Sequence, residues 1–253
     1  MVLQQHKQDW EELGRLHPLW SIKTNKDNWD IKEFFLTGEH EIQDDIERAM
    51  RLGYPRTRET VLDFGCGVGR LTRALSRYFP QCYGVDIAES MIANAKELNQ
   101  SITGCTFIVN SEPHLRIFSD NSFDMIYSKI VLQHIPNTQI IKSYIAEFVR
   151  VLKTDGLLVF QLPSYIPFHM RFLIRCKKGL YRLLRKVGIS EQYLYERLKG
   201  YGKRLNPMHL SYIPEKDIVA FLNAEGARVL EVLADNSTPP PLRSCTYYVT
   251  KQD

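Results

Sequence analysis

The residues with the clearest chemical meaning are the glycines of the loop D-F-G-C-G-V-G, residues 63–69, together with Asp86, which lies 21 positions beyond the first of them. Glycines at alternate positions let a backbone turn tightly and approach a ligand closely. A helix that starts after such a loop offers free N–H groups to an anionic group such as a carboxylate. A carboxylate at the end of the next strand can accept hydrogen bonds from both ribose hydroxyls of an adenosine. A plain tight turn and a solvated surface acid are the alternative interpretations, but the pair together favours a nucleoside-containing ligand.

Arg70 distinguishes this loop from one that binds nicotinamide or flavin dinucleotides. A dinucleotide fingerprint needs Gly or Ala three residues after its second glycine, so that the helix can pack on the strand. Arg70 occupies that position and is too bulky, while the third glycine comes one residue earlier, at Gly69. Asp63 closes the strand, where a cofactor with an amino-acid ammonium and no pyrophosphate would favour a carboxylate. The loop therefore fits such a cofactor better than a dinucleotide.

Four side chains outside the loop are candidates for proton transfer at a second substrate. His134 falls just past the fourth expected strand, where ligand crevices of open α/β sheets lie. It acts either as a base or as a residue that orders its loop through a backbone hydrogen bond. His209 could reach the same crevice, although a structural role is favoured there, and Tyr127 and His169 are further candidates. No cluster of Cys, His or carboxylate residues suggests a metal site.

Alternating strands and helices must position these residues. Short apolar runs predict strands at 61–62, 82–85, 106–109, 123–127, 157–160, 228–233 and 245–250, and helical periodicity predicts helices at 71–79, 89–98, 139–152 and 214–226. A turn at Asp155-Gly156 is expected to lead from the third of these helices into the next strand. The first fifty residues are expected to be helical, with separate helices at 28–36 and 39–52, the second ended by Gly53. This alternation predicts a parallel sheet with helices on both faces.

Four segments resemble, in the right order, the motifs of class I S-adenosylmethionine-dependent methyltransferases. The loop segment V-L-D-F-G-C-G-V-G-R resembles their motif I, and G-V-D-I-A-E-S-M resembles their second motif. The segment S-F-D-M-I-Y-S-K-I-V-L-Q-H-I is similar to their fourth-strand motif, and F-V-R-V-L-K-T-D-G-L-L-V-F to their helix and fifth strand. The resemblance is close over residues 55–162 and looser in the C-terminal helix and hairpin. It implies an α/β fold with a Rossmann-like, seven-stranded, mostly parallel sheet that ends in an antiparallel hairpin.

The resemblance also implies S-adenosyl-L-methionine as cofactor and S-adenosyl-L-homocysteine as its product. The methionine part would be surrounded by Asp63, Gly65, Cys66, Gly67 and Gly69. Asp86 would bind the ribose, while Ile87 and Met91 would pack against the adenine. Where the family often has an acidic residue facing the adenine amino group, this chain has Asn110 and Ser111, which could hydrogen-bond instead. Ser128 would lie near the methyl sulfonium.

The segment from Tyr165 to Asn206 interrupts the alternation and carries much of the positive charge. It contains eleven Lys or Arg and two Glu, a balance of +9 against +4 for the whole chain. One helical face would hold Arg171, Arg175, Lys178, Arg182 and Arg185, and another Leu173, Leu180, Leu184 and Val187. Either this cap packs its apolar face on the fold and leaves its basic face in water, or it contacts an anionic substrate or a membrane surface. Together with Trp20, Trp29, Phe34 and Phe35, the cap is expected to shape the acceptor pocket.

The sequence divides into four parts. A helical extension at 1–55 precedes the cofactor-binding core at 56–164, which is followed by the basic helical cap at 165–206 and by a helix and hairpin at 207–253 that complete the core. Five widely spaced cysteines without a C-x-x-C pair indicate reduced thiols. With no secretory signal and no apolar run long enough to span a bilayer, a cytoplasmic location is expected.

The main hypothesis is an enzyme that methylates an oxygen or nitrogen of a small molecule, such as a sugar or a lipid-linked intermediate. A cofactor-binding pseudoenzyme that serves as a regulatory module is an alternative, because an intact loop predicts binding but not turnover. A nucleotide-dependent oxidoreductase is disfavoured by Arg70. Nucleic acid is disfavoured as a substrate, because no N-P-P-Y-type loop follows the fourth strand and the basic charge sits in one insertion. The oligomeric state is left open.

Overall fold

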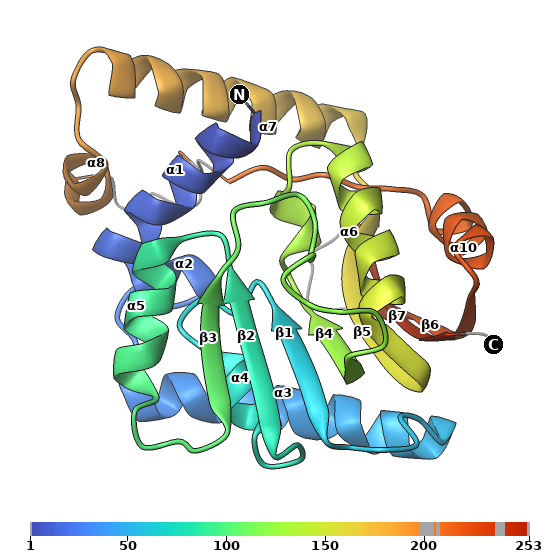
Figure 1. Cartoon of the computed structure of the whole chain (residues 1–253). Coiled ribbons are helices and arrows are strands. Elements are labelled where there is room, and N and C mark those ends of the chain that lie inside the picture. The colour runs from blue at the N-terminus through green and yellow to red at the C-terminus, as the bar shows by residue number, and fades with distance from the viewer. Residues whose placement is uncertain (1, 198–204, 206–207, 236–240, 252–253) are drawn as a thin grey trace.

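The computed structural model describes residues 2–197, 205, 208–235 and 241–251. Its centre is a seven-stranded sheet with the strand order β3-β2-β1-β4-β5-β7-β6 (Figure 1). The strands are β1 (Thr60–Phe64), β2 (Gln81–Asp86), β3 (Cys105–Val109), β4 (Phe123–Ser128), β5 (Leu152–Tyr165), β6 (Ala227–Asp235) and β7 (Arg243–Lys251). Neighbouring strands from β3 to β5 are parallel, whereas β7 runs antiparallel to both β5 and β6. The predicted mostly parallel sheet with an antiparallel closing hairpin is confirmed.

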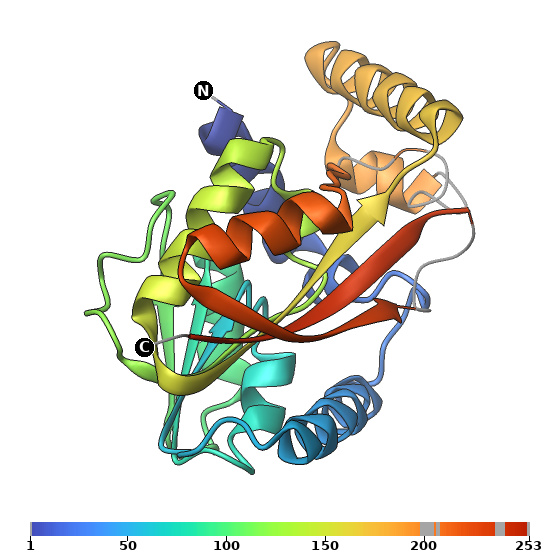
Figure 2. The same ribbon diagram turned by 90° about the vertical axis from the view of Figure 1, so that its right-hand side faces the viewer.

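Helices cover both faces of the sheet (Figures 1 and 2). They are α1 (Val2–Leu16), α2 (Pro18–Ile22), α3 (Ile31–Leu52), α4 (Arg70–Leu75), α5 (Glu89–Leu98), the 3₁₀ turn η1 (Leu132–His134), α6 (Thr138–Val151), α7 (Phe168–Lys186), α8 (Glu191–Arg197) and α10 (Glu215–Ala224). On one face α3 and α4 pack against apolar side chains of β1, β4 and β5. On the other face α6 and α10 form the larger apolar core. Because both faces are buried, the central strands are continuous apolar runs in the sequence.

The helix before the first strand is continuous, whereas the sequence predicted two helices with a break near residue 38. Gly38 lies inside α3 and permits a close approach rather than a break, since a Cβ there would come within 2.7 Å of the Arg70 carbonyl oxygen. The two ends follow the sequence signals. The Asp30 carboxylate accepts the N–H of Glu33 at 2.9 Å, and Gly53 ends the helix in the left-handed conformation, as predicted.

Two other element boundaries differ from the prediction. Helix α4 ends at Leu75 rather than at residue 79, because the Ser76 hydroxyl donates to the Arg73 carbonyl at 2.8 Å and competes with further helix. Strand β5 begins at Leu152, well before the expected residue 157. Asp155 adopts a φ of +60° beside a register shift between β4 and β5, so the expected turn lies within the strand.

Helices α7 and α8 are the described part of the basic insertion, and residues 198–204 and 206–207 lie outside the described residues. Helix α7 runs along the end of the molecule at which the parallel strands finish, beside α1 (Figure 1). The alternative in which α7 packs its apolar face on the fold and leaves its basic face in water describes the helix only in part. Lys178 is buried, and Arg185 pairs with Glu12 of α1 at 2.7 Å, while Leu173 and Val187 are exposed. The predicted basic face is thus divided, because Arg175 and Arg182 remain exposed.

Three negative findings on the described residues concern membrane-spanning helices, metal sites and disulfide bonds. No helix among them combines the length and apolar character needed to cross a membrane. Within the same ranges, no group of three or more His, Cys, Asp or Glu side chains is placed to hold a metal ion. All five cysteines are free thiols, and of these Cys176 is fully exposed on α7.

Candidate functional site

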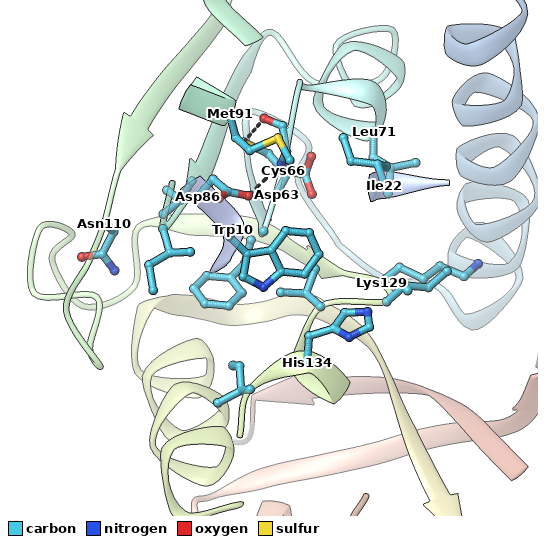
Figure 3. A pocket seen from close by; sticks show the side chains of 18 of the residues that line it. Trp10, Ile22, Asp63, Cys66, Leu71, Asp86, Met91, Asn110, Lys129 and His134 are labelled. Carbon is cyan, nitrogen blue, oxygen red and sulfur yellow. Dashed lines mark hydrogen bonds between the residues drawn. The ribbon is translucent and has the colours of Figure 1, made fainter. Parts of the chain in front are cut away.

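One cavity lies at the carboxyl ends of the four parallel strands β1 to β4 (Figure 3). It encloses about 1000 Å³, including its open mouth. The cavity is lined by nine of the residues singled out from the sequence: Asp63, Gly65, Cys66, Gly67, Asp86, Ile87, Met91, Asn110 and His134. The fold therefore brings together the ends of strands that are far apart in the sequence, as expected for an open α/β sheet.

The glycine loop is held in place by β2 and by the segment after β4. The Gly65 N–H donates to the Val85 carbonyl at 2.7 Å, and the Gly67 N–H donates to the Asp86 carboxylate at 2.9 Å. Gly65 has a φ of +78°, and a Cβ there would lie 2.4 Å from the Val131 methyl groups. Only glycine satisfies both the backbone angle and the close approach. The loop thus presents bare backbone to the cavity.

Two carboxylates face the cavity from the ends of β1 and β2. Asp86 accepts the N–H of Gly67 at 2.9 Å and that of Ala88 at 3.0 Å, and an ionised carboxylate has further lone pairs for a ligand. Asp63 is 2% exposed and accepts the Thr72 hydroxyl at 2.6 Å. Burial raises the pKa of Asp63 to about 7 and also raises that of Asp86. A cation bound beside Asp63 would keep it ionised.

The far wall of the cavity consists of Ile87, Met91 and Asn110. The first two supply apolar surface, and Met91 is almost completely buried. The amide nitrogen of Asn110 donates to the His114 carbonyl at 2.9 Å. The carbonyl oxygen of the same amide is therefore the atom that suits a purine amino group.

Four of the residues singled out from the sequence lie outside the cavity lining. Gly69 starts α4 and faces α5 and β3, where the close packing of these elements needs a glycine. The Ser111 hydroxyl accepts a hydrogen bond from the Lys7 ammonium at 3.1 Å. Ser128 is completely buried, and its hydroxyl has no hydrogen-bond partner among the described residues. His209 contributes its backbone to the site, through the contact with His134 given below.

His134 makes the loop-ordering contact that the sequence offered as one of its two possible roles, and it also lines the cavity. Its Nδ1 lies 2.8 Å from the His209 carbonyl oxygen, and because a carbonyl only accepts, Nδ1 carries the proton. Its Nε2 is then an acceptor and lies 3.2 Å from the Gln133 amide nitrogen. Burial lowers the pKa of His134 to about 4. A neutral imidazole therefore lines the cavity near neutral pH, with the lone pair of Nε2 facing the Gln133 amide, which an acceptor hydroxyl or ammonium would have to replace.

One buried lysine of α7 acts on this imidazole from behind the cavity lining. Lys178 of α7 is 7% exposed, and its ammonium has no hydrogen-bond partner among the residues that the structure describes. Burial lowers the pKa of Lys178 to about 8. Its charge contributes, after burial, to lowering the pKa of His6 to about 3 and that of His209 to about 4. The Asp9 carboxylate of α1 acts on Lys178 in the opposite direction and raises the pKa of the lysine, so part of its charge is compensated.

Helices α1 and α2 form one wall of the cavity, but through residues other than the aromatic ones expected of the N-terminal extension. Trp10 lies edge-on against His134, with ring centroids 5.5 Å apart (Figure 3). Ile22 covers the glycine loop, since a Cβ on Gly67 would come within 2.5 Å of its Cδ1. The aromatic residues expected to shape the pocket are instead packed in apolar clusters outside its lining: Trp20, Trp29, Phe34 and Phe35. No described residue of α7 or α8 lines the cavity.

Tyr127 is a structural residue rather than a candidate for proton transfer. Its hydroxyl donates to Asp45 of α3 at 2.5 Å, and the Tyr248 hydroxyl donates to the other oxygen of the same carboxylate at 2.5 Å. Lys129, which does line the cavity, completes this network at 3.2 Å from Asp45. Burial raises the pKa of Tyr127. His169 is exposed at the start of α7 and does not line the cavity.

Residues 62–160 match the family described as a methyltransferase domain. Over 102 aligned residues the chain is 35% identical to the malonyl-acyl-carrier protein O-methyltransferase of Bacillus cereus. The aligned segment is 40% of this chain and 36% of that protein. Over 101 residues it is 34% identical to the 2-methyl-6-phytyl-1,4-hydroquinone methyltransferase of Synechocystis, which covers 40% of this chain and 30% of that one. The chain thus spans about a third of the length of these curated relatives.

Solved structures resemble the chain over nearly its whole length. The magnesium protoporphyrin IX methyltransferase of Synechocystis with bound SAH superposes with a TM-score of 0.63 at 14% identity, covering 98% of this chain and 99% of that one. An S-adenosylmethionine-dependent methyltransferase of Clostridium acetobutylicum gives a TM-score of 0.62 at 19% identity, covering 92% and 96%. At sequence identities this low, the structural similarity shows that the chain shares the fold of these proteins.

Proposed function

We propose that this chain, whose residues 62–160 match the methyltransferase-domain family, transfers a methyl group from S-adenosyl-L-methionine to an oxygen or nitrogen of a small molecule. One observation carries the proposal. Asp63 and Asp86 face a single cavity and are linked by a glycine loop with bare backbone. A carboxylate for an ammonium and another for a ribose diol are what this cofactor requires.

The residues present fit the cofactor part by part. Asp63, buried and inclined to be neutral when alone, would become ionised beside the amino-acid ammonium. Asp86 keeps acceptor capacity beyond its two backbone donors for the ribose hydroxyls. Ile87 and Met91 offer apolar surface to the adenine, and Asn110 offers an amide oxygen. When bound, the cofactor supplies an electrophilic methyl group on a sulfonium sulfur.

The residues of this chain would then position the acceptor and manage its proton. Trp10 and His134 form the part of the cavity wall beside the glycine loop and restrict where an acceptor can lie, and such positioning supplies much of the acceleration in an in-line displacement. The proton of an acceptor hydroxyl or ammonium would pass to Nε2 of His134, because Nδ1 already carries one. A pKa of about 4 keeps this imidazole unprotonated and available near neutral pH.

We expect the acceptor to be small and amphipathic, with an anionic group, as in a lipid-linked or acidic intermediate. Ile130, Val131 and Ile135 supply apolar lining. Lys178, behind the cavity lining, supplies a buried positive charge that has no hydrogen-bond partner among the described residues and is only partly offset by Asp9; it contributes to lowering the pKa of three histidines at this end of the site. An unpaired buried charge is costly unless a ligand compensates it.

Calorimetric titration with S-adenosylmethionine, S-adenosylhomocysteine and NADH tests the cofactor assignment. Both sulfur compounds should bind with micromolar affinity and NADH should not bind. Replacing Asp86 by Ala should weaken binding at least about 100-fold, since two hydrogen bonds to a charged group are lost. Glu97→Ala, an exposed carboxylate on α5 outside the cavity lining, is the matched control and should bind like the parent. Equal binding by both variants would contradict the site.

Turnover separates the enzyme from a binding module. Release of S-adenosylhomocysteine should be measured with acceptor panels of sugars, quinols, acyl thioesters and amines, each with and without an acidic group. Cofactor binding together with methylation of one class would establish the acceptor. Tight binding without methylation of any class would favour the regulatory module instead.

A further inference from the structure

Helix α7 exposes large apolar side chains along the side that faces away from the fold. Their exposed fractions are 74% for Phe168, 61% for Phe172, 53% for Leu173, 50% for Leu180, 58% for Leu183 and 67% for Val187. We call these six side chains the outer face of α7. They follow the helical repeat and form one stripe along the helix. Single exposed apolar residues are ordinary in proteins, but a contiguous stripe marks a surface that meets a partner.

Within the described residues the outer face stays exposed, because α7 is anchored from its other side. Lys178 and Tyr181 are the buried residues of the helix. The Tyr181 hydroxyl donates to the Glu191 carboxylate of α8, and Arg185 pairs with Glu12 of α1 at 2.7 Å. In Figure 2, α7 projects from the body of the molecule. The outer face is therefore open to a partner with α7 in the position that it already has.

Exposed basic residues border this stripe. Arg175, Arg182 and Lys186 are all exposed, and the helical repeat places them together along one edge of the outer face. An apolar face with a basic border is the pattern of a helix that lies in the surface of an anionic membrane. Juxtamembrane basic residues are attracted by the negative potential of anionic lipids. The charge of the border is thus complementary to a lipid surface.

We propose that the outer face of α7 docks on an anionic lipid bilayer, with the apolar side chains among the acyl chains and the basic border at the lipid phosphates. A second copy of this chain fits the surface less well, because pairing two such faces brings two basic borders together. Docking in this way turns the end of the molecule that carries α1 toward the membrane (Figure 1). The inference concerns the surface of α7 and does not depend on the methyl-transfer activity.

Vesicle co-sedimentation of the full chain is the direct test. The chain should bind vesicles of phosphatidylcholine mixed with phosphatidylglycerol, and bind vesicles of phosphatidylcholine alone more weakly. The double variant Phe172→Ser and Leu183→Ser should lower the partition coefficient at least about tenfold, because two inserted side chains are removed. Removing the charge of Arg182 with Gln should lower it about fivefold on anionic vesicles only.

A matched control removes as much exposed apolar surface elsewhere. Met50 on α3 is 47% exposed and Ile117 is 51% exposed, and the double variant Met50→Ser and Ile117→Ser should bind vesicles like the parent. Circular dichroism should show that both double variants are folded. Vesicle binding equal to that of the parent in the α7 variant would overturn the proposal. The proposal would also be overturned if the folded parent chain bound neither kind of vesicle. The same holds if the parent were a dimer in analytical ultracentrifugation and the α7 double variant, unlike the control variant, were a monomer.

Cys176 provides a second readout at the same surface. It is fully exposed on α7, while Cys66, Cys82 and Cys245 are buried and Cys105 is partly buried. An environment-sensitive fluorophore attached to Cys176 should shift to shorter emission wavelength on anionic vesicles, because the label enters an apolar medium. A label that reports water while the protein is vesicle-bound would place another surface on the membrane and would contradict the proposal.

Discussion

His6 makes the docking of α1 sensitive to acid, and the direction of the effect follows from its surroundings. The side chain is 7% exposed. Its pKa is lowered to about 3, first by burial and then by His134, His209 and Lys178. In an unfolded chain the same imidazole titrates near 6.5. Between these two values the unfolded chain holds a proton that the folded protein excludes. The contribution of the neutral His6 imidazole to the free energy of unfolding is therefore fully present above about pH 6.5 and is lost as the pH falls toward 3.

The size of the effect can be worked out for one pH step. At about pH 5 the unfolded imidazole is almost fully protonated and the folded one is almost fully neutral, which corresponds to about 2 kcal/mol. His134 and His209, whose pKa values are both lowered to about 4, act in the same direction. Removing His6 should therefore remove part of the acid sensitivity. If α1 detaches before global unfolding, the figure is an upper bound, because local opening relieves the burial at lower cost.

Urea unfolding of the parent and of His6→Gln, each at about pH 7.5 and about pH 5, is the assay. The loss of unfolding free energy between the two pH values should be smaller in the variant by about 2 kcal/mol. His40→Gln, at an exposed position of α3, is the control and should keep the full loss. If the parent and His6→Gln lose the same free energy on acidification, the imidazole is solvated or protonated in the folded state and the reasoning fails.

Three further substitutions test individual contacts. Gly67→Ala should lower the free energy of unfolding by about 1–2 kcal/mol and weaken cofactor binding, because φ of this residue is +53° and the new Cβ would meet Ile22. Adding Ile22→Ala to the same chain should recover part of the cofactor affinity, measured by calorimetry. His134→Gln should lower kcat by about 10²–10⁴-fold at unchanged cofactor affinity, whereas an unchanged kcat would leave it a loop-ordering residue. Lys178→Met should raise KM for an anionic acceptor about tenfold while unfolding free energy holds or rises; an unchanged KM would argue against an anionic acceptor.

The part of the site that lies within one strand-loop-helix unit could be predicted from the sequence. Gly65 and Gly67 are needed by the backbone itself, and Asp86 follows from the end of the next strand, so local patterns determine where they lie. Asp63 is predicted for the same reason. Because parallel strands end at the same edge of a sheet, these local predictions converge on one cavity without knowledge of the tertiary structure.

What the sequence could not predict depends on how distant elements pack. Trp10 and Ile22 reach the cavity only because α1 and α2 fold back over the glycine loop, and no local pattern marks that placement. The amphipathic pattern of α7 predicts an apolar and a basic face, but amphipathicity alone does not say which side turns inward. The side that does so combines the apolar contacts of Tyr181 and Leu184 with the ion pair between Arg185 and Glu12. Gly38 shows the same limit: the separate helices expected at 28–36 and 39–52 are one continuous helix, in which this glycine permits the close approach of Arg70.

The position of β7 has a consequence for synthesis on the ribosome. β7 pairs with both β5 and β6, although β6 precedes it in the chain. A nascent chain that has emerged only as far as β6 therefore has no neighbour for that strand and leaves the β5 edge unpaired. Unpaired strand edges are templates for association with other chains. Premature termination between β6 and β7 should therefore give fragments that associate through this edge and become insoluble.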